Sequence, residues 1–303
     1  MSLLARQSGI SEQMAAFGME WLPGERMSQH TSLRVGGPAD IIRVYDARRL
    51  PELAAYLHGH GVPWRILGGG SNLLVADQGL PEVLLQLARG EAMAFAGNRA
   101  EVPAAANLGT AILECAKRNL GGMEGLIGVP GTVGGALRMN AGAYGTEMGD
   151  VVRALTVFHG ATGLIETVKT EKVRFEYRHT SFSPDGVMLA VTLELLDCPY
   201  AVILERIKQC NWKRRASQPI QERSAGCIFK NPPGRSTGKM IDELGLKGTR
   251  VGGAVISERH ANFIVNRDHA TAADILKLMD FIRARVLKAY GLELDEEVIV
   301  WKG

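Results

Sequence analysis

The sequence predicts an α+β protein of two domains, and three features of the 303-residue chain support this prediction. At 40–67 a strand pattern, a helix pattern and a second strand pattern follow one another, as in a βαβ unit. Between 151 and 196 the pattern changes to β-type segments. Beyond Pro199 helices and strands alternate again. We therefore expect a first domain over 1–199, made of two α+β subdomains, and a smaller α/β domain over 200–303.

The elements of the first domain follow from periodicity and turn residues. Apolar residues indicate strands over 40–45 and 64–67, with a helix over 51–60 between them. A further helix is expected over 108–118. The glycine-containing stretch 160–163 is typical of a hairpin turn between two strands.

The second domain begins with a charged amphipathic helix over 200–215. We expect, in order, a strand near 227–230, a helix near 239–244, strands near Val255 and Phe263, a last helix, and a strand over 292–301. Thr271 is a suitable N-cap for the last helix and Gly291 a suitable stop, because threonine accepts backbone hydrogen bonds and glycine adopts left-handed backbone angles.

Composition limits the possible classes of protein. The formal net charge is only +3, so we expect no nucleic-acid partner. No stretch approaches the roughly 18 apolar residues of a membrane span, and no signal-peptide pattern is apparent. The four cysteines lie at no metal-type spacing, so we predict no metal site and free thiols in a cytoplasmic protein. The chain is expected to be a monomer or a weak oligomer.

Two glycine-rich loops, at 67–74 and 128–136, are candidates for cofactor binding. Glycines allow consecutive backbone N–H groups to face one anion, and they allow a flat ring or a pyrophosphate to approach without a Cβ in the way. Two such loops suggest a dinucleotide, although tight turns alone are the alternative. Neither loop has the Gly-Lys-Ser/Thr of a P-loop or the full Gly-x-Gly-x-x-Gly fingerprint, which disfavours those folds. A third run of small residues follows at 139–145.

Together these three segments resemble the FAD-binding domain of the UDP-N-acetylenolpyruvoylglucosamine reductase family, which has the vanillyl-alcohol-oxidase/PCMH-type fold. Further stretches are similar to the motifs of this family in the same order: 30–39, 177–182, 224–232, 260–266 and 294–298. The resemblance implies that the second domain binds the substrate. It also implies the shorter type II branch, because 187–200 leaves no room for the insertion that caps the substrate in the other branch.

The resemblance implies FAD as the cofactor and NADPH as the hydride donor. The FAD is expected to be non-covalent, because covalent members of the wider fold use His or Cys, which both glycine loops lack. The implied cofactor-binding residues are Leu67, Gly68, Gly69, Gly70, Ser71, Asn72, Leu73, Gly128, Pro130, Gly131, Gly134, Gly135, Ala136, Asn140, Ala141 and Gly142.

Three residues match the family's catalytic positions. Arg178 would hold the substrate carboxylate while negative charge develops on it. Cys227 stands where the family has a serine or cysteine proton donor, and a thiol is a better acid than an aliphatic hydroxyl. Glu297 matches the third position, although Ile299 stands where arginine is expected in this motif. Without the resemblance, a surface arginine, a small buried cysteine and a solvated acid would be the ordinary interpretations.

Candidate substrate-binding residues are Tyr177, Arg178, Lys230, Asn231 and Arg214. The implied reaction is the NADPH-dependent reduction of the enolpyruvyl ether of UDP-N-acetylglucosamine to UDP-N-acetylmuramate, a step of peptidoglycan synthesis. The partners would then be the UDP-sugar and NADPH. A flavin-dependent alcohol oxidase or dehydrogenase of the same fold is the alternative, but such an enzyme needs a base rather than these three residues. A non-enzymatic nucleotide-binding module would leave the C-terminal motifs without a purpose.

Overall fold

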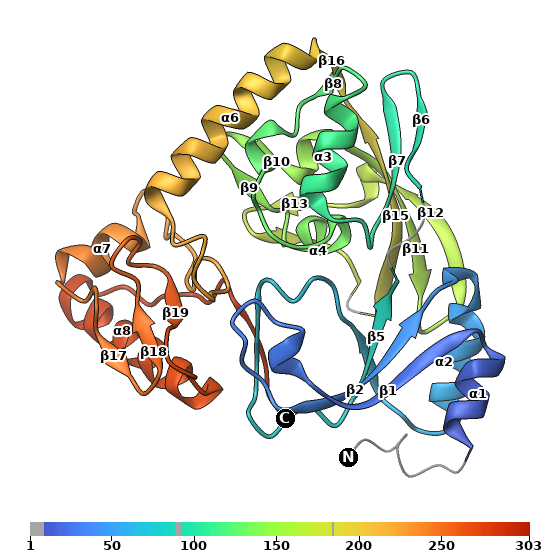
Figure 1. The fold of residues 1–303 in the computed structure, drawn as a ribbon, viewed down its shortest axis with the longest axis horizontal. Helices are drawn as coiled ribbons and strands as arrows, with labels where there is room; N and C mark the ends of the chain where they lie inside the picture. The colour runs from blue at the N-terminus through green and yellow to red at the C-terminus, as the bar shows by residue number, and fades with distance from the viewer. Residues whose placement is uncertain (1–8, 89–91, 184) are drawn as a thin grey trace.

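The computed structural model describes residues 9–88, 92–183 and 185–303. Figure 1 shows three bodies. An N-terminal subdomain (9–88) and a sheet subdomain (92–199) lie next to each other, and a C-terminal unit (218–303) lies beside them. Helix α6 (Tyr200–Ser217) connects the sheet subdomain to the C-terminal unit.

The N-terminal subdomain is a four-stranded sheet in the order β1-β2-β5-β3, with its helices on one side. Its strands and helices are α1 (Ile10–Ala16), β1 (Met19–Arg26), β2 (Pro38–Val44), α2 (Leu50–Gly59), β3 (Trp64–Ile66), β4 (Leu73–Val75) and β5 (Val83–Leu87). β5 runs parallel to both β2 and β3 and separates them. The predicted strands and helix between 40 and 67 are therefore confirmed. The insertion of β5 between the two strands was not predicted.

The sheet subdomain is built on a five-stranded antiparallel sheet in the order β12-β11-β15-β7-β6. Its strands are β6 (Ala94–Ala96), β7 (Arg99–Pro103), β11 (Val152–His159), β12 (Leu164–Lys169) and β15 (Gly186–Glu194). Its helices are α3 (Leu108–Ala116), α4 (Val133–Arg138) and α5 (Met148–Val151). Both the predicted helix near 108–118 and the hairpin turn at 160–163 are confirmed.

Three short two-stranded pairs complete this subdomain. They are β8 (Leu120–Gly121) with β16 (Leu196–Asp197), β9 (Gly142–Ala143) with β10 (Thr146–Glu147), and β13 (Phe175–Glu176) with β14 (His179–Thr180). The last pair carries Tyr177 and Arg178 in its turn.

The C-terminal unit packs α7 (Thr237–Glu243) and α8 (Ala272–Tyr290) with a small sheet. The strands are β17 (Arg250–Val251), β18 (Ala254–Ile256) and β19 (Ile264–Asn266). Thr271 caps α8 in a capping box and Gly291 ends it with φ of 65°, as predicted. The predicted strand near 227–230 is wrong: only an isolated bridge joins Phe229 to Glu296. The predicted strand over 292–301 is shortened to β20 (Ile299–Trp301).

The C-terminal unit is joined tightly to the N-terminal subdomain. β20 pairs in parallel with β4, directly after the first glycine loop. The carboxylate of Asp77 accepts hydrogen bonds from the backbone N–H groups of Ala272 and Ala273 at 2.8 and 3.1 Å, and it therefore caps α8 across 195 residues of sequence. The apolar core of the C-terminal unit also includes Leu33 and Leu74.

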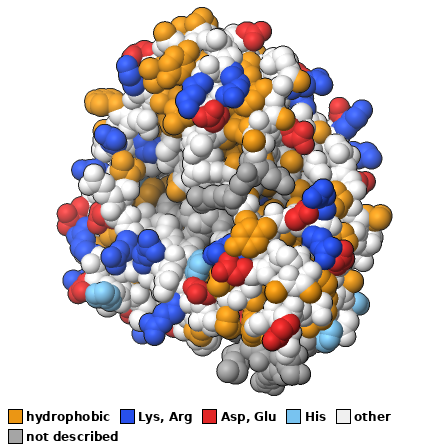
Figure 2. All heavy atoms as spheres, turned by 45° about the vertical axis from the view of Figure 1, so that its right-hand side comes forward, with side chains coloured by type: hydrophobic (Ala, Val, Ile, Leu, Met, Phe, Trp, Pro, Cys, Tyr) orange, Lys and Arg blue, Asp and Glu red, His pale blue; other side chains and the backbone are white. Residues whose placement is uncertain are grey.

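Helix α6 packs on the sheet subdomain, because Ile203 and Ile207 belong to that subdomain's apolar core. The boundary between residues 199 and 200 stays a prediction. In the described part of the chain, no helix combines the length and apolarity needed to cross a membrane. On the face shown in Figure 2, basic and acidic side chains lie among one another.

Candidate functional site

The two glycine loops lie in direct contact. The Ser71 hydroxyl donates to the carbonyl of Pro130 at 2.9 Å. A Cβ built on Gly69 would lie 2.8 Å from the Cα of Gly131. Gly131 has φ of 120°, and a Cβ there would lie 2.7 Å from Ser71 Oγ. At Gly69 a Cβ would collide with the backbone of the other loop, and at Gly131 the positive φ itself favours glycine.

A cavity of about 360 Å³ borders both loops. Its walls include Gly69, Ser71, Pro130 and Gly131, together with the segments 29–32 and 221–223. Arg34 and Arg223 also line it and bring positive charge. Backbone walls and nearby cations suit a dinucleotide, whose pyrophosphate needs N–H donors and positive charge. The residues present therefore fit a cofactor such as FAD.

The other predicted cofactor residues lie around these loops. Leu67, Leu73 and Ala136 are buried, and Gly68 and Gly135 lie against the hydroxyl of Thr132, which caps α4. Gly70 has φ of 63° and lies against the carbonyl of His30, and Gly134 lies against Ala104. Gly128 lies against Arg214, and Ala141 and Gly142 follow the buried Asn140.

Asn72 lies at the junction between the first loop and the C-terminal residues. Its side-chain amide donates to the carbonyl of Glu297 at 2.9 Å, and its carbonyl accepts from the N–H of Ile299 at 3.0 Å. This amide positions the backbone of a predicted catalytic residue.

Arg178 and Glu297 form an ion pair with 2.7 Å between Nε and Oε1, although 119 residues separate them. Their side chains are only 21% and 15% exposed, so the pair is held away from bulk water. Burial by itself would lower the pKa of Arg178, but Glu297 outweighs this effect and the pKa is raised. Burial raises the pKa of Glu297, and the charges of Arg178 and Lys230 oppose that rise. Arg178 is therefore a permanent cation at this site.

Cys227 faces the same group of charges. Burial, followed by the charge of Glu297, raises the pKa of its thiol to about 12, while Arg178 and Arg214 act in the opposite direction. At neutral pH the thiol therefore carries its proton. The structure thus brings the three predicted catalytic residues into one electrostatic neighbourhood.

The loop that carries Cys227 is held by two other segments. Asn262 accepts from the N–H of Phe229 and donates to its carbonyl, at 3.1 and 2.7 Å. The backbone N–H of Glu297 donates to the carbonyl of Ile228 at 2.8 Å. These bonds replace a regular strand ladder, and they explain why the strand predicted at 227–230 does not form. They also hold Cys227 at a constant position relative to Glu297.

Arg178 occupies the second position of the two-residue turn between β13 and β14 and has φ of 55°. Such a left-handed conformation is unfavourable for residues with a Cβ, and outliers of this kind gather at functional sites. A Cβ built on Gly142 would lie 3.3 Å from Arg178 Nη1, so this glycine leaves the space that the guanidinium borders.

Comparisons with known proteins match both parts of the chain to known families. Residues 38–169 match the FAD binding domain, and residues 218–301 match the UDP-N-acetylenolpyruvoylglucosamine reductase C-terminal domain. UDP-N-acetylenolpyruvoylglucosamine reductase of Moorella thermoacetica is 38% identical over 293 residues, which cover 96% of each chain. The corresponding protein of Thermus thermophilus is 42% identical over 272 residues, or 90% of this chain and 97% of its own.

The chain belongs to the UDP-N-acetylenolpyruvoylglucosamine reductase family.

The crystal structure of the reductase from Thermus caldophilus superposes with a TM-score of 0.81 at 40% identity. The superposition covers 93% of this chain and 98% of that one. The predicted fold class and the FAD cofactor are confirmed by this match and by the match to the FAD binding domain.

Two of the predicted substrate-binding residues of this reductase-family chain, Tyr177 and Lys230, lie near the Arg178–Glu297 ion pair. The Arg178 guanidinium carbon lies 4.9 Å from the ring centre of Tyr177, whose hydroxyl accepts from the N–H of Asn231 at 3.4 Å. The side-chain oxygen of Asn231 accepts from the N–H of Thr237 at the start of α7. Lys230 precedes Asn231, and its N–H donates to the carbonyl of Asp295 at 2.9 Å.

Arg214 is buried and only partly satisfied. Its Nε donates to the carbonyl of Ile127 and its Nη1 to Gln218, at 3.2 and 3.0 Å, and its guanidinium lies 5.3 Å from the ring centre of Tyr144. Within the described residues, its buried Nη2 finds no acceptor. Burial lowers the pKa of Arg214. Arg34 and Arg223 were not predicted; the only signal in the sequence was that Arg34 lies within the 30–39 motif and that Arg223 directly precedes the 224–232 motif.

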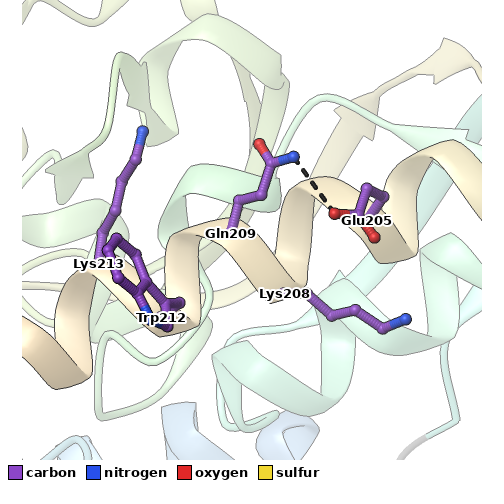
Figure 3. A pocket seen from close by; sticks show the side chains of 5 residues that line it. All are labelled: Glu205, Lys208, Gln209, Trp212 and Lys213. Atoms are coloured by element: carbon purple, nitrogen blue, oxygen red, sulfur yellow. Dashed lines mark hydrogen bonds between the residues drawn. The ribbon is translucent and has the colours of Figure 1, made fainter.

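A second cavity of about 390 Å³ lies on the exposed face of α6 and shares no lining residue with the reductase-type site. Its lining residues are Glu205, Lys208, Gln209, Trp212 and Lys213. Figure 3 shows these side chains projecting from a single helix, with Gln209 bonded to Glu205. A hollow lined by long flexible side chains of one helix offers no convergent set of polar groups, so we assign no function to it.

Proposed function

We propose that this protein catalyses the NADPH-dependent reduction of UDP-N-acetyl-3-O-(1-carboxyvinyl)-glucosamine to UDP-N-acetylmuramate, in the cytoplasm, as a step of peptidoglycan synthesis. The observation that supports this most is the grouping of Arg178, Glu297 and Cys227, which Asn72 links to the first glycine loop by its hydrogen bond to the carbonyl of Glu297. A fixed cation and a protonated acid are what the reduction of an enol ether beside a carboxylate requires.

The glycine loops at 67–74 and 128–136 would hold FAD, which would supply hydride transfer to the outer vinyl carbon of the sugar nucleotide with NADPH as the source of the hydride. Arg178 binds the carboxylate of the substrate. Its guanidinium bonds Glu297 through Nε, so the donors for the substrate carboxylate would be the two Nη groups. Negative charge spreads onto the carboxylate as the hydride adds, so this contact strengthens in the transition state.

Cys227 then donates its proton to the carbon that bears the carboxylate. A thiol with a pKa of about 12 is protonated at neutral pH and is still a far stronger acid than an aliphatic hydroxyl. The thiolate left behind is stabilised by the charges of Arg178 and Arg214, which pull the pKa of this thiol down. Glu297 orients Arg178, because one carboxylate oxygen accepts from the guanidinium Nε.

The diphosphate of the sugar nucleotide requires further cations. Arg214 has a donor without an acceptor in the described chain, and Lys230 follows the catalytic loop. A buried donor without a partner is costly, which supports a role for Arg214 Nη2 in binding a ligand oxygen. Tyr177 and Asn231, which are bonded to each other, lie beside Arg178.

The visible spectrum under anaerobic conditions tests this proposal. NADPH should bleach the yellow flavin band of the purified holoprotein, and the enolpyruvyl UDP-sugar should restore it. If only oxygen restores the band, the protein is an oxidase and the proposal fails. If NADH bleaches the band as fast as NADPH, the assignment of the hydride donor is wrong while the reaction stands.

A further inference from the structure

The buried side chain of Asn140 has every hydrogen-bonding group engaged within the chain. Its Nδ2 donates to Glu147 Oε2 at 2.8 Å and to the carbonyl of Glu176 at 3.1 Å, while its Oδ1 accepts from the N–H of Gly149 at 2.9 Å. Only 1% of Asn140 is exposed. A carboxamide fits this arrangement in one orientation only, because the reverse would place oxygen against a carbonyl and a carboxylate.

One of these bonds reaches the turn that carries Arg178. Glu176 pairs with His179 across the two-residue turn, so its carbonyl lies at the base of that turn. Asn140 therefore holds the backbone at the point where the chain enters Tyr177 and Arg178. The turn is only two residues long, so a shift of its base moves the guanidinium.

Gly142, two residues beyond Asn140, lies near the guanidinium itself. The position of a Cβ on Gly142 would be 3.3 Å from Arg178 Nη1 and 3.3 Å from Glu147 Oε1. Asn140 has φ of 39° and Arg178 has φ of 55°, so both residues hold conformations that the surroundings must enforce. The segment 140–142 thus bonds the turn at its backbone base and lies near its charged end.

We infer that Asn140 is a positioning residue for Arg178, which sets where the guanidinium meets the substrate carboxylate. This inference rests on the proposed function. Asn140 acts through the hydrogen bond to the carbonyl of Glu176 and through the placement of Gly142 against Nη1. It differs from direct cofactor binding, for which the side chain of Asn140 has no group left.

Asn140→Asp and Asn140→Ala test the inference. Aspartate keeps the acceptor for Gly149 and tolerates positive φ, but it loses both donors and places a carboxylate beside Glu147. In anaerobic stopped-flow experiments on variants loaded with FAD, NADPH should still reduce the flavin. Reoxidation by the enolpyruvyl UDP-sugar should slow on the order of 10²-fold, because small misplacements of a reacting group have effects of this size.

Two controls separate positioning from general damage. Asn119 also has positive φ, 60°, and accepts a backbone N–H with its side chain, but it bonds Tyr200 at the start of α6, so Asn119→Ala should reoxidise like the native protein. In an Arg178→Ala background, Asn140→Ala should slow single-turnover reoxidation no further, because no guanidinium remains to be positioned.

The outcomes distinguish this inference from the proposed function. If the native protein is not reoxidised by the sugar nucleotide, both fail. If it is, but Asn140→Asp reoxidises at the native rate, the positioning role alone is refuted. The same holds if Asn140→Ala slows the Arg178→Ala protein by its full factor, since that result would show an effect independent of the arginine. FAD content and thermal midpoint, measured for each variant, identify any that is merely unfolded.

Discussion

Replacing Arg178 by glycine should give an inactive protein that is more stable than the alanine variant. Both substitutions remove the guanidinium and leave Glu297 without its partner, so they differ only in the backbone. At φ of 55° a residue with a Cβ is disfavoured by about 1–2 kcal/mol, whereas glycine adopts this conformation freely. The greater freedom of glycine in the unfolded chain costs about 0.5–1 kcal/mol. The net difference should therefore favour Arg178→Gly by about 0.5–1 kcal/mol.

Thermal unfolding with saturating FAD measures this difference. For a chain of this size, 1 kcal/mol corresponds to about 2 °C or somewhat more, so Arg178→Gly should melt about 1–2 °C above Arg178→Ala. His179 is the control, because it lies in β14, and there glycine should be the less stable choice. If alanine is the more stable residue at both positions, the strain assigned to the Arg178 turn does not exist. Activity should be lost in both Arg178 variants.

Three further predictions concern the acid, the glycine loops and the thiols. Cys227→Ala should keep flavin reduction by NADPH but slow reoxidation by the sugar nucleotide about 10²- to 10⁴-fold in single-turnover experiments, whereas Ser224→Ala should react normally. Gly69→Ala should lose FAD absorbance on gel filtration, because its Cβ would lie 2.8 Å from Gly131; Gly59→Ala, with nothing within 4 Å, should retain it. Burial raises the pKa values of Cys115 and Cys227 from 9.0 to about 12. Between these two pH values the thiols ionise in the unfolded chain but not in the folded protein. The free energy of unfolding should therefore be unaffected by these thiols below pH 9 and should fall as the pH rises from 9 toward 12. Denaturant titrations between pH 8 and 11 should show this fall, and a Cys115→Val protein that falls just as steeply would contradict it.

Much of the fold could be predicted from local patterns. The helix capped by Thr271 and stopped by Gly291 formed as predicted, because its signals lie in neighbouring residues. The predictions that failed share one cause, which is hydrogen bonding to residues that are distant in the sequence. The strand predicted at 227–230 is a loop because the side chain of Asn262 takes its backbone hydrogen bonds. The insertion of β5 between β2 and β3 likewise depends on pairing that no local pattern specifies.

The candidate site was also predictable only in part. The motifs identified Arg178, Cys227 and Glu297 as candidates. They did not predict that these residues lie close together, because that depends on the pairing of β20 with β4. The hydrogen-bond partners of the Asn72 and Asn140 amides could not be predicted from motifs. A motif identifies an asparagine near a cofactor loop, whereas only the structure shows that its amide bonds the backbone of Glu297 or Glu176.

The pairing of β20 with β4 places the last strand of the described chain beside one of the first. During synthesis, the first glycine loop and its strand leave the ribosome more than 200 residues before the strand that completes their sheet. Glu297 is also synthesised only at that late stage, so the hydrogen bond from the Asn72 amide to its carbonyl cannot form earlier. A nascent chain can therefore form the βαβ portion early, but it cannot assemble the ion pair of Arg178 and Glu297 until translation is almost finished. Contacts of such long range make for slow folding, so we expect that the reductive site is the last part of the molecule to mature.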